Sequence, residues 1–106
     1  MAFTGHEEHQ ITFKEGSELT KTYRDQMNAG DRKGGYFSKD EILTLLDPSI
    51  CVGIRFYYGI DEYGKQVMVL VGVKANEDDL IGEGYYCMEM SVPCPDQCGS
   101  DNILNS

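Results

Sequence analysis

The segment from Cys51 to Ala75, CVGIRFYYGIDEYGKQVMVLVGVKA, carries the strongest pattern in the chain. In its first half, large apolar residues occupy every second position, which is the period of a strand with one buried face. In its second half, valines alternate with Met, Leu and Gly, so both faces are apolar. Between the halves, Asp61-Glu62-Tyr63-Gly64 fits a type I turn that ends on a glycine with positive φ. The segment therefore predicts a β-hairpin.

The turn predicts a register for this hairpin, with Asp61 opposite Lys65 and Phe56 opposite Leu70. The row that contains Phe56 and Leu70 is predicted to be buried under helices, and its other members are Val52, Ile54, Tyr58, Ile60 and Met68. The opposite face also contains Val73 and is more apolar than a face in contact with water should be, so we expect either another chain or the C-terminal tail, residues 93–106, to cover it. The candidate interface residues are Arg55, Tyr57, Val67, Val69 and Val71.

Two helices are predicted before the hairpin. Thr12 with Glu15, and Ser38 with Glu41, have the spacing of capping boxes, and apolar residues follow each pair at helical intervals. The second helix is expected to end before Pro48, because the residue that precedes a proline is disfavoured in the α conformation. The glycine-rich segment at 31–36 between the helices has the composition of a loop.

After the hairpin, residues 83–92 are predicted to form a third strand, with one row of apolar side chains at Tyr86, Met88, Met90 and Val92. Residues 93–106 contain two prolines among polar residues and are predicted to be irregular unless a crosslink or a metal holds them. Residues 1–10 lack a periodic pattern and are interpreted as a mobile lead-in. Residues 11–106 are then expected to form one α+β domain, with both helices on one face of a three-stranded antiparallel meander.

The chain of 106 residues is strongly acidic, with a formal net charge of −9. Such a surface repels nucleic acids and anionic membranes and attracts a basic protein partner. No signal peptide is visible at the start, and the longest apolar run, Val67 to Val73, is too short to cross a bilayer. These features predict a soluble cytoplasmic protein without a nucleic-acid or membrane partner.

The four cysteines, Cys51, Cys87, Cys94 and Cys98, are the candidate metal ligands. Four thiolates suit a structural zinc site, and strand alternation predicts Cys51 and Cys87 on the same face of the sheet. The alternatives are a disulfide and free thiols, which are the usual state in a reducing compartment. No other cofactor is expected.

No catalytic constellation is visible in the sequence. The only histidines, His6 and His9, are one residue too close for the zinc-protease motif. We therefore expect a non-enzymatic binding module that associates with a protein partner or with itself as a homodimer. Two alternatives stay open: a zinc-binding or thiol-redox protein that uses the cysteines, and an acidic inhibitor of a basic partner.

Three segments resemble a group of short bacterial proteins that have no assigned activity: CVGIRFYYGIDEYGK, VLVGVKANEDDL and PCPDQCGSDNILNS. The resemblance covers roughly residues 11–106, and its most specific parts are the hairpin and the Pro-Cys-Pro tail. It implies membership of a bacterial family and carries over no catalytic residue.

Overall fold

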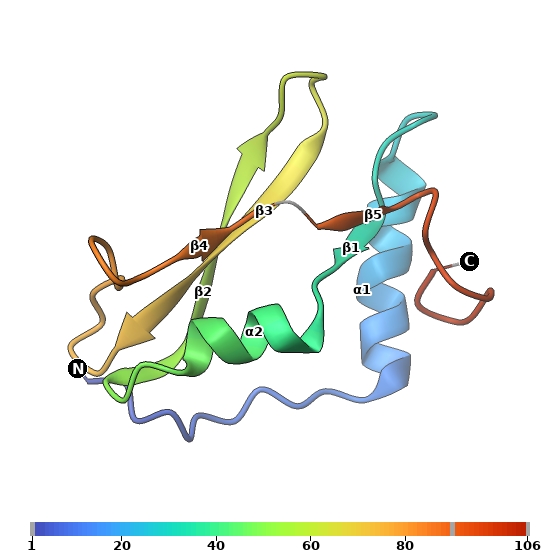
Figure 1. Cartoon of the computed structure of the whole chain (residues 1–106). Helices are drawn as coiled ribbons and strands as arrows, with labels where there is room; N and C mark the ends of the chain where they lie inside the picture. The colour runs from blue at the N-terminus through green and yellow to red at the C-terminus, as the bar shows by residue number, and fades with distance from the viewer. Residues whose placement is uncertain (1, 90, 106) are drawn as a thin grey trace. The chain divides into compact units, whose positions relative to one another are not determined.

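A computed structural model of the chain describes residues 2–89 and 91–105 (Figure 1). Two helices and antiparallel strands in two sheets confirm the α+β class. The chain divides into two compact units, Met1–Glu8 with Phe37–Ser91 and His9–Tyr36 with Val92–Ser106, and each is described by itself. The elements are α1 (Phe13–Gln26), β1 (Gly34–Tyr36), α2 (Lys39–Leu46), β2 (Cys51–Ile60), β3 (Gln66–Lys74), β4 (Cys87–Met88) and β5 (Val92–Cys94).

The first unit is built on the predicted hairpin of β2 and β3 (Figure 1). The predicted register is confirmed: Phe56 pairs with Leu70, and the amide of Asp61 donates to the carbonyl of Lys65 at 2.9 Å. Gly64 closes the turn with φ +77°, as expected. Strand β4 pairs antiparallel with β3, so the strand order is β2-β3-β4 and β2 is an outer strand.

Helix α2 lies on the predicted face of this sheet but covers only one end of it. Ser38 caps the helix by accepting from the amide of Glu41, as predicted. The helix approaches β3 at Gly72, where the carbonyl oxygen of Leu45 lies 3.2 Å from the position that a Cβ would occupy. Eight residues make a helix of only ~12 Å, which is too short to cover the hairpin to its tip. Helix α1 belongs to the second unit, so of the two helices predicted on this face the first unit contains α2 alone.

The predicted burial of the two hairpin faces requires correction. Leu70 is 8% exposed as expected, but its partner Phe56 is 48% exposed, because α2 does not reach it. On the opposite face Val67, Val71 and Val73 are buried, and this face was predicted to be covered by the C-terminal tail or by another chain. Their burial removes the reason for which a homodimer was expected at this face. Alternation identifies the two rows of side chains, but both rows are apolar and the pattern does not reveal which one is covered.

The predicted third strand is reduced to the two residues of β4. Gly82 and Gly84 adopt φ values of +119° and +89°, and the amide of Tyr85 donates to the carbonyl of Gly82 at 3.2 Å. This turn occupies the residues that were expected to begin the strand. Met90 of the predicted row lies outside the described residues, and Val92 belongs to β5.

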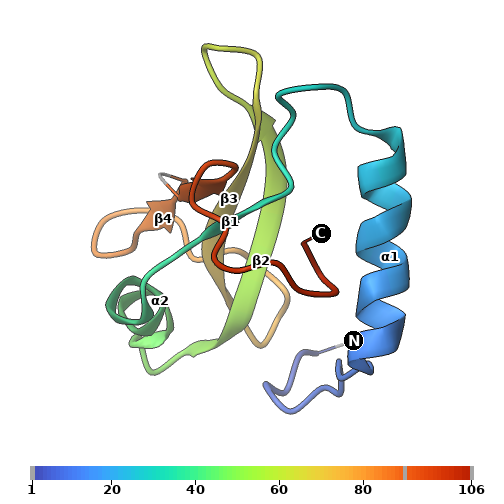
Figure 2. The ribbon, with the colours of Figure 1, turned by 90° about the vertical axis from the view of Figure 1, so that its right-hand side faces the viewer.

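The second unit contains α1, the short β1–β5 sheet and the C-terminal segment. The capping box of Thr12 and Glu15 is confirmed at the start of α1. The guanidinium of Arg24 in α1 donates to the carbonyl of Leu104 at 2.6 Å, and Figure 2 shows the C-terminal segment beside the helix. The segment 31–36 was predicted to be a loop, but Gly34–Tyr36 within it form strand β1, which pairs with β5. The loop prediction was therefore wrong for Gly34–Tyr36.

Candidate binding surface

Five large apolar side chains lie exposed on the α2 face of the hairpin, toward its tip. We call this set the apolar row. Tyr58 and Ile60 are each 71% exposed, and the rings of Phe56 and Tyr58 meet edge to face at 5.5 Å between centroids. The members of the apolar row are Ile54, Phe56, Tyr58, Ile60 and Met68. Their contiguity matters, because a folded protein in water seldom leaves neighbouring large apolar side chains uncovered without a use for them.

Four of these residues also present their backbone at the outer edge of β2. In an antiparallel pair, every second residue of a strand bonds to its partner strand, and the residues between them point their N–H and C=O groups away. The bond from Asp61 to Lys65 places the odd-numbered residues of β2 toward β3. Ile54, Phe56, Tyr58 and Ile60 therefore face the open edge, and in the described part of the chain no turn or loop hydrogen bond reaches their backbone.

A polar network lies on the opposite face of β2 and holds two of the predicted interface residues. The guanidinium of Arg55 donates to Oδ1 of Asp79 at 2.5 Å, and the hydroxyl of Tyr57 donates to Oδ2 at 2.5 Å. The guanidinium of Arg55 also donates to the carbonyl of Glu77 at 3.0 Å. Its central carbon, Cζ, lies 5.8 Å from the centre of the Phe3 ring. The network thus connects β2 to the turn after β3.

Sequence reasoning missed Asp79, since no local pattern pairs it with Arg55, 24 residues away. Phe3, which belongs to the predicted lead-in, is also held in place, because its backbone N–H donates a hydrogen bond to the carbonyl of Ala75 at 2.8 Å. Among the predicted interface residues, Tyr57 is 47% exposed, whereas Val67 and Val71 are buried.

The Asp79 network makes stability depend on pH. The hydrogen bond from Tyr57, and next the bond and charge of Arg55, lower the pKa of the Asp79 carboxyl. A carboxyl whose pKa is lowered by folding adds stability above its unfolded-state pKa, and this stability is lost as the pH falls through the folded-state pKa. Urea midpoints measured over an acid series should therefore fall less steeply for Asp79→Asn than for the wild type. The neighbouring carboxylate of Asp78 accepts from Asn76 instead, so Asp78→Asn should keep the wild-type dependence. Equal slopes for all three proteins would contradict this role of Asp79.

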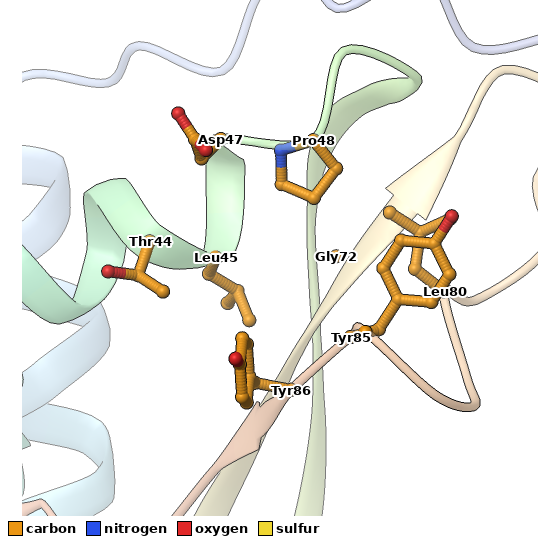
Figure 3. A pocket seen from close by; sticks show the side chains of 9 residues that line it. Thr44, Leu45, Asp47, Pro48, Gly72, Leu80, Tyr85 and Tyr86 are labelled. Atoms are coloured by element: carbon orange, nitrogen blue, oxygen red, sulfur yellow. The ribbon is translucent and has the colours of Figure 1, made fainter.

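A separate open pocket of about 350 Å³ lies between α2, β3 and the loop before β4 (Figure 3). Its wall combines the apolar side chains of Leu45 and Leu80 with the rings of Tyr85 and Tyr86, and Asp47 is its only carboxylate. Because the lining offers no pairing of a nucleophile with a base, we assign no reaction to it. The remaining lining residues are Thr44, Pro48, Gly72 and Gly84.

The four cysteines are not brought together as one set of thiolates. Cys94 and Cys98 form a disulfide in the second unit, and Cys51 and Cys87 are free in the first. The prediction that Cys51 and Cys87 share a face was wrong, because a bulge between Cys51 and Gly53 shifts the register. Cys51 consequently lies beside Gly72, whereas Cys87 pairs with Val71, which belongs to the other face.

No group of three or more His, Cys, Asp or Glu side chains within the described residues is placed to hold a metal ion. A disulfide has no thiolate to offer, so a zinc site built from all four cysteines stays a prediction for the reduced chain.

Comparisons with protein-family models, with curated proteins and with solved structures yield no match to this chain. Within residues 2–89 and 91–105, neither helix has the length and apolar character needed to cross a membrane.

Proposed function

We propose that this chain is a non-enzymatic binding module whose contact surface is the apolar row. The observation that carries the proposal is the exposure of neighbouring aromatic and aliphatic side chains on one face of an outer strand. Aromatic side chains dominate the energetics of many protein interfaces, because each buries a large area when a partner covers it. Phe56 and Tyr58 stand at the centre of the row and are its expected anchors.

A protein partner fits this surface better than a small molecule does. The row follows an extended strand, and small ligands bind in concave sites that enclose most of their surface. An extended apolar row can be covered only by a surface or a segment of comparable length. The strong net negative charge supports a basic partner, which its long-range field would attract.

The proposal is tested by affinity capture with the tagged full chain from extracts of the cells that produce it. The double variant Phe56→Ser, Tyr58→Ser removes both anchors, and Tyr63→Ser, Ile81→Ser removes two apolar side chains that are 78% and 79% exposed outside the row. Partners captured by the wild type should be retained by the control and reduced at least about tenfold by the row variant, as for interface anchors.

Circular dichroism and urea midpoints establish that both variants are folded. Capture that is equal for the row variant and the wild type, or that falls equally in the two variants, would contradict the proposal.

A further inference from the structure

We infer that the partner binds by adding an extended segment to the sheet, as an extra strand along the open edge of β2. This inference rests on the proposed function and specifies the chemistry of the partner: a basic polypeptide segment with apolar side chains at alternate positions. Addition of a strand gives affinity through backbone hydrogen bonds and specificity through every second side chain. Three features of β2 support it.

The first feature is that the exposed side chains and the backbone groups directed to the outer edge belong to the same residues. Ile54, Phe56, Tyr58 and Ile60 each direct one N–H and one C=O group to the outer edge, and each exposes its side chain on the α2 face. Between Ile54 and Ile60 the strand spans ~20 Å. A segment paired here would bond to all four residues and would place alternate side chains against the apolar row.

The second feature is that β2 lacks the devices that usually prevent edge pairing. Natural outer strands are often short, or carry lysine, proline or an inward-pointing charge. Strand β2 is ten residues long and contains no proline, lysine or carboxylate. Its one charged residue, Arg55, is bound to Asp79 on the other face, and its one bulge lies at the start of the strand, between Cys51 and Gly53.

The third feature is the distribution of charge. The unit that contains β2, residues Met1–Glu8 and Phe37–Ser91, has four Lys and Arg against twelve Asp and Glu, a formal charge of −8. The other unit has five Lys and Arg against six Asp and Glu, a formal charge of −1. Acidic residues lie near both ends of the open edge. Asp61 and Glu62 follow Ile60 at the hairpin tip, and Glu7 and Glu8 follow Gly5, where a Cβ would lie 3.0 Å from the carbonyl oxygen of Val52.

This charge distribution selects the occupant. A second copy would bring two strongly acidic units together, which their mutual repulsion opposes. A segment with lysine or arginine at both ends would instead meet carboxylates at both ends of the edge, while its apolar residues meet the apolar row.

The inference is tested on the wild-type full chain with a labelled synthetic peptide of about nine residues, enough to span the edge. Valine occupies alternate positions, threonine lies between, and lysine stands at each end. Fluorescence anisotropy should show saturable binding that weakens as the salt is raised from about 0.05 to about 0.5 M, because screening shortens the reach of the carboxylates. Glutamate in place of the terminal lysines should weaken binding as well.

Backbone methylation of the peptide distinguishes strand addition from contact with the face alone. N-methyl groups on one alternate set of peptide residues should weaken binding at least about tenfold, because they remove the donors that pair with β2. The same groups on the other set should leave affinity nearly unchanged. No protein variant is needed for this comparison.

A matched pair of protein variants gives an independent readout. Tyr58→Ala removes the ring and keeps the outward amide, whereas Tyr58→Pro also removes the amide at a position where an outer strand tolerates proline. Tyr58→Pro should bind the peptide more weakly than Tyr58→Ala by at least about fivefold.

Three results would overturn the inference. Equal effects of the two methylation patterns would indicate binding by the face alone, and would leave the proposed function intact if the Phe56→Ser, Tyr58→Ser variant still lost capture. No binding of the peptide at millimolar concentration would reject a basic strand as the occupant. A wild-type dimer in sedimentation equilibrium that Tyr58→Pro dissociates would identify a second copy as the occupant instead.

Discussion

Leu70→Ala should lower the free energy of unfolding by about 2–5 kcal/mol, the cost of truncating a buried leucine. Leu70 is 8% exposed and pairs with Phe56 on one side and Met88 on the other, so removal of its side chain leaves a cavity in the centre of the sheet. A loss of this size is a large part of the total stability of a small protein, which is typically ~5–15 kcal/mol.

Phe56→Ala is the matched comparison at the paired position. Its side chain is half exposed, so truncation should cost only about 1 kcal/mol, well below the cost of a fully buried aromatic residue. Urea midpoints of the two variants and the wild type test the assignment. Equal losses at Leu70 and Phe56 would show that the apolar row is covered within the chain, and would remove the basis of the proposed function.

The hairpin and the helix starts were predictable because the interactions that form them are local. The register follows from the turn at Asp61–Gly64, and the first helix follows from the capping box of Thr12 and Glu15. Each feature depends on residues close in sequence, so the residue types and their spacing carry the information.

The features that the sequence did not predict depend on distant residues. Strand β1 forms because Gly34–Tyr36 pairs with Val92–Cys94, far along the chain, and a glycine-rich segment gives no sign of that partner. The bulge that moves Cys51 to the other face is likewise absent from the alternation pattern, which assumes an unbroken register.

The candidate surface was predictable in its members but not in its exposure. The row with Ile54, Phe56 and Tyr58 was identified and assigned to the core, because two helices were expected to cover this face of the sheet. Helix α2 is only eight residues long and covers the end near Gly72. The absence of lysine, proline and carboxylate from Cys51–Ile60 was the one sequence feature that could have indicated an unprotected outer strand.

Amide hydrogen exchange along β2 tests the open edge most directly. In the free protein, the amides of Arg55, Tyr57 and Gly59 point toward β3, and those of Ile54, Phe56, Tyr58 and Ile60 point toward solvent. We expect the first set to exchange more slowly by at least about a hundredfold, because their exchange requires the hairpin to open, whereas the second set is already exposed. Residue-resolved exchange followed by NMR should show this alternation. Uniform protection from Ile54 to Ile60 would mean that another strand already occupies the edge, and would contradict an open binding edge on β2.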